Sequence, residues 1–186
     1  VEFGTGGWRA IIGKDFICEN IRRVAKGIYL LMAEQNRADK PVIIGYDRRF
    51  LSETAAKWVA EVLAANGIKV YIFSRLMPTP MLSYAIMRLK CQGGIVITAS
   101  HNPSKYNGYK CYDPSGYQMT DEAAFATYSF IQKVDIFEDI KRIPFDEAME
   151  KGLIGYIPDE ITEEFYSLVM ERPINPDARD LKIIYT

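Results

Sequence analysis

Short apolar runs alternate with helical patterns over the first half of the chain. Three runs, each followed by polar or turn-forming residues, have the length and the β-branched content of strands: 42–47, 69–73 and 91–97. Amphipathic or helix-favouring stretches precede and separate them: 20–36, 52–65 and 81–90. This alternation indicates mainly parallel strand pairing through right-handed crossovers. We therefore predict an α/β fold, a three-layer α/β/α sandwich with a mainly parallel (mixed) central sheet.

The apolar runs also identify the expected centre of the fold. Parallel strands that are covered by helices on both faces are almost continuously apolar. The residues expected in that sheet are Val42, Ile44, Val70, Ile72, Ile95 and Ile97. At the helix ends we expect Ser52 and Thr120 as N-caps and Asn66-Gly67 as a C-cap.

In the second half of the chain the predicted strands and helices no longer alternate regularly. A short strand is predicted at 108–112, followed by helices at 121–133 and 158–170. Between these helices, 135–155 mixes charges with scattered apolar residues, and we interpret it as surface elements with one short helix near 145–151. Along the first amphipathic helix, Arg22, Arg23 and Lys26 are expected on the solvent side.

Composition excludes several classes of protein. A net charge of −1 argues against a general role at nucleic acids or membrane surfaces. There is no apolar run of membrane-spanning length and no secretory signal at the start of the chain. The three cysteines have no metal-site spacing, which favours reduced thiols and a cytoplasmic location. We thus expect no nucleic-acid partner and no membrane partner.

The residues after the third apolar run carry the most chemistry. A strand that ends in Thr98, Ala99 and Ser100 delivers small polar side chains to the sheet edge where open α/β sheets bind their ligands. Ser100 is a candidate nucleophile, and His101 is the only histidine in the chain. Lys105 and Lys110, further along, suit an anionic substrate or a phosphorylated serine. A plain turn is the competing interpretation, since Asn-Pro and Asn-Gly are turn-forming pairs.

These residues form part of a longer pattern. Residues 97–103, Ile-Thr-Ala-Ser-His-Asn-Pro, followed by Tyr-Asn-Gly-Tyr-Lys at 106–110, resemble the phosphoserine loop of the α-D-phosphohexomutases, the family of phosphoglucomutases and phosphomannomutases. Three further stretches are similar to that family: the glycine-rich segment 3–13, the Gly-x-Asp-x-Arg-x-x-Ser pattern of 45–52 and a Thr-Pro pair at 79–80. Gly6 and Ala10 depart from the residues that many relatives carry.

The resemblance implies roles for individual residues. Ser100 would carry the phosphate, His101 would contact the substrate, and Arg9 and Lys110 would bind phosphate or take part in proton transfer. Residues implied to support phosphate or substrate are Thr5, Arg49, Asn102 and Asn107. For Arg49 the resemblance leaves open whether that support is structural or a direct phosphate contact.

The resemblance also implies an activity and its cofactors. Members interconvert hexose 1-phosphate and hexose 6-phosphate through a sugar bisphosphate intermediate, with Mg²⁺ beside the serine phosphate and glucose 1,6-bisphosphate or a similar compound as activator. Residues 1–178 correspond to the first domain of that family, with the phosphoserine loop at 97–110, and 179–186 to a linker and a truncated first strand of the second. Since the remaining metal ligands belong to missing C-terminal domains, we expect Ser100 to contribute the metal contact of this chain and the fragment alone to be inactive.

Two other functions remain open at this point. Ser100 and His101 are compatible with a serine hydrolase, although adjacent residues leave the chain in different directions and no Gly-x-Ser-x-Gly elbow is present. A non-catalytic phosphosugar-binding module would use the same loop without transferring phosphate.

Overall fold

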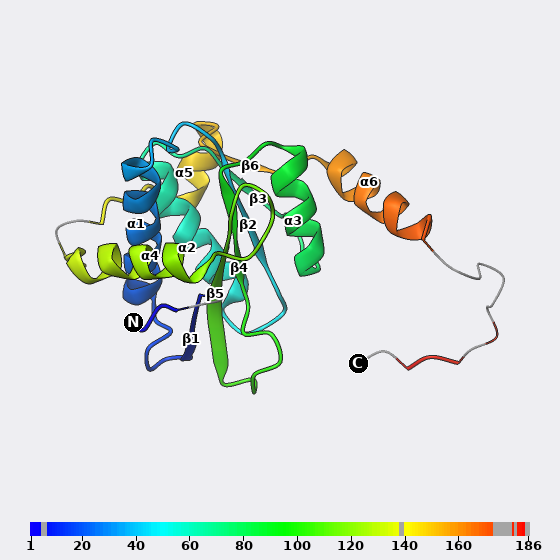
Figure 1. The fold of residues 1–186 in the computed structure, drawn as a ribbon, viewed down its shortest axis with the longest axis horizontal. Helices are drawn as coiled ribbons and strands as arrows, with labels where there is room; N and C mark the ends of the chain where they lie inside the picture. The colour runs from blue at the N-terminus through cyan, green and yellow to red at the C-terminus, as the bar shows by residue number, and fades with distance from the viewer. Residues whose placement is uncertain (5–6, 138–139, 173–179, 181, 185–186) are drawn as a thin grey trace.

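The computed structural model describes the whole chain except residues 5–6, 138–139, 173–179, 181 and 185–186. A six-stranded sheet lies at its centre (Figure 1), in the order β1-β5-β4-β2-β3-β6. The strands are β1 (Trp8–Ile11), β2 (Val42–Tyr46), β3 (Val70–Ile72), β4 (Gly93–Ile97), β5 (Tyr106–Tyr112) and β6 (Ile154–Tyr156). Strands β4, β2, β3 and β6 run parallel, whereas β5 is antiparallel to both β4 and β1.

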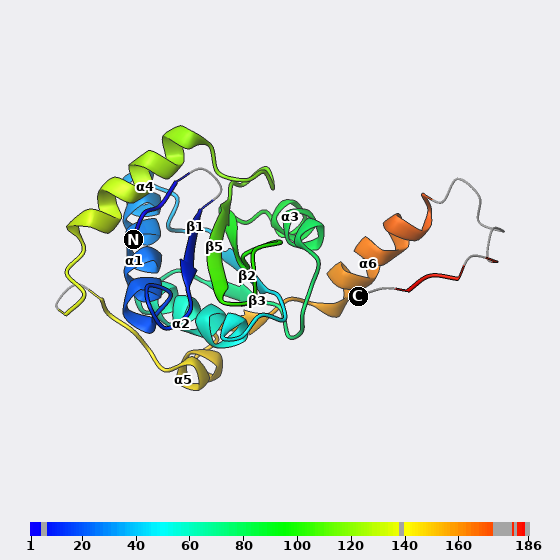
Figure 2. The same ribbon diagram turned by 90° about the horizontal axis from the view of Figure 1, so that it is seen from below.

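Helices cover both faces of this sheet (Figure 2). One face carries α1 (Cys18–Glu34), α2 (Ser52–Ala65), α4 (Asp121–Lys133) and the short α5 (Phe145–Glu150). The other face carries α3 (Thr79–Arg88), against which α6 (Asp159–Met170) begins to pack. The predicted α/β/α sandwich with a mainly parallel, mixed sheet is therefore confirmed.

Each face of the sheet has its own apolar core. The larger core includes Ile44 and Ile95 with the residues of α1 and α2, and the smaller one includes Ile43 and Val96 with α3. Neighbouring residues of one strand thus alternate between the two cores, as strand geometry requires. All six residues predicted for the centre are buried: Val42, Ile44, Val70, Ile72, Ile95 and Ile97.

Helix ends confirm two of the three predicted caps. The Thr120 hydroxyl accepts the N–H of Ala123, and α2 ends at Asn66 with Gly67 in the left-handed region at φ +85°. The prediction for Ser52 was wrong, because Ser52 is the first helical residue and Leu51 precedes it as the cap. The Ser52 hydroxyl donates instead to Asp47, which draws it away from the helix end.

Two further sequence interpretations need correction. The mixed region before α6 contains the strand β6, which was read as surface structure because its pattern spans only three residues. Arg22 and Arg23 are half-buried rather than solvent-facing: Arg22 pairs with Glu61 of α2, and Arg23 donates to the carbonyl oxygens of Ile131 and Gln132 at the end of α4. These arginines therefore join helices within one layer.

The predicted division after residue 178 and the strand at 181–186 fall largely outside the described residues. Residues 182–184, which the structure does describe, are not in a strand. Within the described part of the chain, every helix is too short or too polar to cross a lipid bilayer.

Candidate functional site

The serine loop, residues 98–106, begins where β4 ends. Its neighbour along the same edge of the sheet is the loop after β2, since Tyr46 pairs with Ile97 in the parallel register. Carboxyl ends of parallel strands meet at one edge, which is where such sheets hold their ligands. The structure therefore places the loops that contain Ser100 and Arg49 side by side.

Ser100 combines an exposed side chain with an unusual backbone. Its φ of 56° lies in the left-handed region, which is uncommon for a residue other than glycine. Its N–H donates to the Thr98 hydroxyl at 2.9 Å, and its Oγ lies 3.4 Å from Nδ1 of His101, also exposed. A hydroxyl held outward on such a turn is accessible to a substrate and to a phosphate donor.

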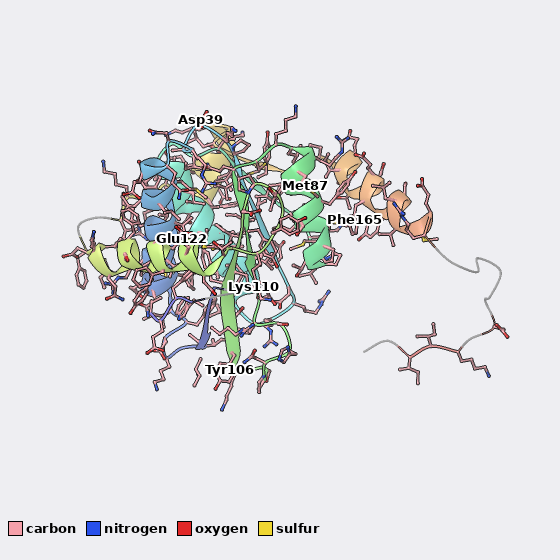
Figure 3. The ribbon with its side chains drawn as sticks, in the orientation of Figure 1. Asp39, Met87, Tyr106, Lys110, Glu122 and Phe165 are labelled. Carbon is pink, nitrogen blue, oxygen red and sulfur yellow. The ribbon has the colours of Figure 1, made fainter. Side chains whose placement is uncertain are left out.

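Arg9 and Lys110 come from the two antiparallel strands beside this loop. Trp8 pairs with Tyr109, and both face the larger core, so Arg9 and Lys110 point to the opposite face of the sheet. Burial lowers the pKa of Lys110, and the positive charge of Arg9 lowers it further. Figure 3 shows Lys110 on β5, the strand that begins at Tyr106 at the end of the serine loop. The pair thus forms a cationic surface next to that loop.

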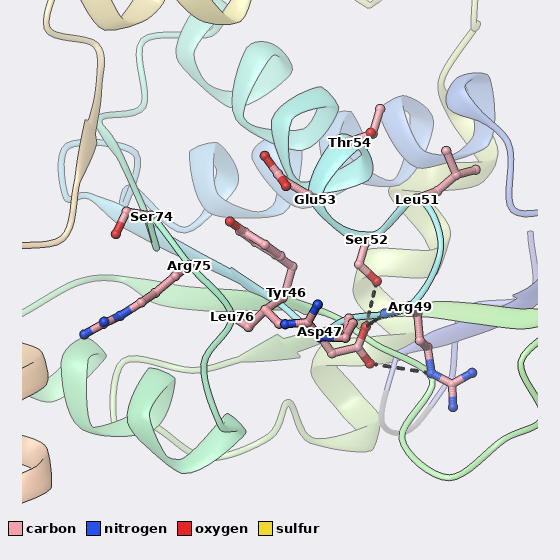
Figure 4. Close-up of a pocket in the computed structure, with 11 residues that line it drawn as sticks. Tyr46, Asp47, Arg49, Leu51, Ser52, Glu53, Thr54, Ser74, Arg75 and Leu76 are labelled. Atoms are coloured by element: carbon pink, nitrogen blue, oxygen red, sulfur yellow. Dashed lines mark hydrogen bonds and ion pairs between the residues drawn. The ribbon is translucent and has the colours of Figure 1, made fainter. Parts of the chain in front are cut away.

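Arg49 is in direct contact with the serine loop. Its guanidinium donates hydrogen bonds of 2.5 to 3.1 Å to four backbone carbonyl oxygens of that loop, those of Ser100, Asn102, Pro103 and Tyr106. Its Nε lies 3.5 Å from the carboxylate of Asp47 (Figure 4). The sequence predicted that Arg49 lies near this loop, and the geometry adds which atoms it meets.

The two asparagines of the motif occupy different positions. Asn102 is half-buried within the loop, and its N–H donates to the carbonyl oxygen of Ala99. Asn107 is fully buried, and its amide group donates to the Ser52 hydroxyl and to the carbonyl oxygen of Phe50. Thr5, the remaining candidate, lies outside the described residues.

Two open cavities border the loop after β2. One, of about 360 Å³, is lined by residues that include Asp47, Arg48, Glu53 and Arg75 (Figure 4). The other, of about 490 Å³, lies between Arg48, Phe50 and Ser104 of the serine loop. Sequence reasoning missed these lining residues and the anchoring role of Asp47 and Ser52, although both anchors belong to the Gly-x-Asp-x-Arg-x-x-Ser pattern.

The described residues by themselves do not form a metal site. No group of three histidine, cysteine or carboxylate side chains among them is arranged to hold an ion. Asp47, whose carboxylate contacts Arg49 beside the loop, already accepts hydrogen bonds from the Ser52 hydroxyl and from the Arg49 backbone N–H. A hard cation beside a phosphorylated Ser100 would take its other ligands from elsewhere.

Comparison with known proteins identifies the family of this chain. Residues 1–136 match the family described as phosphoglucomutase/phosphomannomutase, alpha/beta/alpha domain I. Over its full length the chain is 36% identical to a phosphoglucomutase of Staphylococcus saprophyticus and 40% identical to a probable phosphoribomutase of Schizosaccharomyces pombe, covering 34% and 33% of those proteins. The chain thus spans about a third of the length of these curated relatives.

The fold has solved counterparts. The structure resembles parafusin, a phosphoglucomutase from Paramecium in an open form, with a TM-score of 0.73 at 21% identity over 90% of this chain and 34% of that chain. It also resembles a putative phosphomannomutase from Thermus thermophilus, with a TM-score of 0.69 at 33% identity over 81% of this chain and 35% of that chain. These likenesses support the arrangement of the layers, and the family match covers the residues of the serine loop. The chain belongs to the phosphoglucomutase/phosphomannomutase family, of which it contains the α/β/α domain I.

Proposed function

We propose that this chain is the phosphoserine-bearing domain of a sugar-phosphate mutase that interconverts hexose 1-phosphate and hexose 6-phosphate. The observation that carries the proposal is the exposed Ser100 on a backbone turn fixed by Arg49, with the Arg9–Lys110 pair on the adjacent strands. Phosphoryl transfer depends mostly on positioning and on neutralising charge on the moving oxygens, and this edge of the sheet offers both.

Each transfer breaks and forms one bond. The bond between phosphorus and the Ser100 Oγ breaks, a bond from phosphorus to a sugar hydroxyl oxygen forms, the hydroxyl proton passes to a base, and the released Oγ takes up a proton to become the serine hydroxyl again. Lys110 suits that proton transfer, because a lowered pKa enlarges its neutral fraction near neutral pH. The Arg9 guanidinium would hold phosphate oxygens, and the exposed His101 would contact the sugar.

The remaining parts of the active site are proposed to lie outside this chain. Magnesium beside the phosphorylated Ser100 would stabilise charge during transfer, and a sugar 1,6-bisphosphate would load the serine. Because the described residues lack a complete ligand set, we assign no reaction step to the metal. Reduced thiols favour a cytoplasmic location, since Cys91 and Cys111 are free and buried.

The sugar is proposed from the names of the relatives. They include phosphoglucomutases and a probable phosphoribomutase. Because most of these relatives are named for glucose, a hexose, we propose a hexose phosphate as the substrate. A serine hydrolase is less favoured, since the 3.4 Å contact of Ser100 with His101 joins neighbouring residues on an exposed turn.

A coupled mutase assay tests this function. The full-length polypeptide that carries this domain should convert glucose 1-phosphate to glucose 6-phosphate when a sugar bisphosphate and Mg²⁺ are present, and the 186-residue chain alone should not. Mannose 1-phosphate and ribose 1-phosphate assayed in parallel identify the sugar. Labelling of Ser100 by a fluorophosphonate, together with absence of mutase turnover in the full-length polypeptide, would instead indicate a hydrolase.

A further inference from the structure

Every donor of the Arg49 guanidinium already faces an oxygen of the protein. Arginine has five N–H donors in a rigid fork. The two on Nη1 meet the carbonyl oxygens of Pro103 and Tyr106, and the two on Nη2 meet those of Ser100 and Asn102. The fifth, on Nε, faces the Asp47 carboxylate at 3.5 Å. Arg49 thus has no donor left for a phosphate unless it releases the loop.

Asp47 and two buried polar residues hold this arginine in place. One carboxylate oxygen of Asp47 accepts the Arg49 backbone N–H at 2.9 Å and the Ser52 hydroxyl at 2.7 Å. The Ser52 oxygen in turn accepts from the buried amide of Asn107 at 2.9 Å. Asn107 lies in β5, the strand that follows the serine loop. The hydrogen-bonded chain therefore connects both ends of the loop to the start of α2.

Backbone strain is present on both sides of this contact. Ser100 has φ 56° and Leu51 has φ 65°, both in the left-handed region. Such residues persist when the surrounding structure determines them, and they cluster at functional sites. The four hydrogen bonds from Arg49 to carbonyl oxygens hold Ser100 in this conformation, because they leave its peptide group few alternative orientations.

We propose that Arg49 is a positioning residue. Together with Asp47, Ser52 and Asn107 it fixes the backbone of the serine loop and so aims the Ser100 hydroxyl, and it does not bind the transferred phosphate. The backbone part of this inference concerns the unphosphorylated chain alone, whereas its consequence for catalysis rests on the proposed function.

Hydrogen exchange of the loop amides tests the backbone part. The amides of Ser100, Asn102 and Tyr106 are hydrogen-bonded within the loop, so their exchange reports its opening. In the unphosphorylated chain, Arg49→Ala should accelerate their exchange by at least about tenfold, since each hydrogen bond to a charged group has an effect of that size or larger. Unchanged exchange at these amides would overturn the proposal.

Matched variants separate positioning from general destabilisation. Arg48→Ala removes an exposed neighbouring arginine of the same cavity and should leave loop exchange unchanged. Asp47→Asn and Arg49→Lys should give intermediate acceleration, because each keeps part of the network. If Arg49→Ala fails to fold, these two milder variants decide, and acceleration confined to the loop supports the proposal. Equal acceleration at the α4 amide of Ala124 would contradict it, because the whole domain would then be loosened.

Kinetics of the full-length polypeptide test the catalytic part. Displacement of a reacting group by about 1 Å can lower a rate about 100-fold, so Arg49→Ala should lower kcat by that factor and leave KM nearly unchanged. Removal of a ligand of the transferred phosphate would instead raise the concentration of glucose 1,6-bisphosphate needed to load Ser100, because that phosphate arrives on the bisphosphate, and this result would overturn the positioning role. If the unaltered polypeptide shows no mutase turnover at all, the proposed function fails, while the exchange experiment still decides the backbone part.

Discussion

The two neighbouring loops at the carboxyl edge of the sheet differ in which of their groups are available. In the serine loop the side chains of Ser100 and His101 are exposed, while its backbone carbonyl oxygens are bound by Arg49. In the loop after β2, by contrast, the polar side chains of Asp47 and Ser52 are hydrogen-bonded to one another. The difference indicates that one loop supplies reactive groups and the other supplies their fixed geometry.

The largest expected effect comes from removing the reactive group itself. Ser100→Ala in the full-length polypeptide should lower mutase turnover by more than about 10³-fold, because no phosphate carrier remains. Its thermal unfolding midpoint should stay near that of the unaltered protein, since the Ser100 side chain is exposed. The coupled assay and a melting curve check both parts, and a near-normal rate would remove Ser100 from its role.

A substitution at Gly108, in the strand β5 that follows the serine loop, should disturb the backbone beside that loop. A Cβ at Gly108 would lie 2.6 Å from the Trp8 carbonyl oxygen and 2.7 Å from that of Thr98, so neighbouring strands would have to move. Gly108→Ala should cost about 3 kcal/mol of the free energy of unfolding, at the upper end of overpacking effects. Denaturant unfolding measures this cost. Gly155→Ala, where the nearest atom would be 3.9 Å away, is the matched control and should show little change.

The Arg9–Lys110 pair predicts a pH dependence of defined sign. Burial lowers the Lys110 pKa first and the Arg9 charge second, so Arg9→Gln should raise it while leaving it below that of a free lysine. Titration followed by NMR of the Lys110 side chain measures the shift. No movement in the Arg9→Gln variant would contradict the coupling.

The same lowered pKa links Lys110 to stability. Between its pKa in the folded chain and the higher value in the unfolded chain, unfolding takes up a proton. The free energy of unfolding should therefore rise slightly as the pH increases between these two pKa values. Lys110→Met should remove this contribution. Unfolding curves of the two proteins, compared at several pH values, provide the measurement.

Removal of the ion pair between Arg88 and Glu164 should have the smallest effect. The Arg88 guanidinium of α3 donates hydrogen bonds to both carboxylate oxygens of Glu164 in α6, and both side chains are about half exposed. Because water and salt screen such pairs, Arg88→Ala should lower the melting midpoint by less than about 4 °C, and added salt should reduce the difference. A larger loss would mean that α6 depends on this contact far more than exposed ion pairs normally allow.

Much of the fold could be predicted from local pattern. The runs around Ile44, Ile72 and Ile95 are apolar because helices cover both faces of their strands, and that signal does not depend on distant residues. Strand β6 could not be found, since three residues carry almost no periodic signal and its place at the sheet edge depends on pairing with β3.

The candidate site was predictable as a set of residues but not as a geometry. The motif identified the loop, Arg9, Lys110 and Arg49 in advance, yet it could not say what each group touches. The position of Ser52 illustrates the reason. Its local sequence favours an N-cap, whereas the carboxylate of Asp47 in the preceding loop and the amide of Asn107, which is distant in sequence, determine its hydrogen bonds. Contacts between separate segments decide such details.

Phosphate on Ser100 is the most direct test of the account. The full-length polypeptide, incubated with glucose 1,6-bisphosphate and Mg²⁺ and then digested, should yield the peptide containing Ser100 with the added mass of one phosphoryl group. Addition of glucose 1-phosphate should remove that group from the serine as the sugar bisphosphate forms. Absence of phosphate on Ser100, or its stable presence on another residue during turnover, would contradict the central claim.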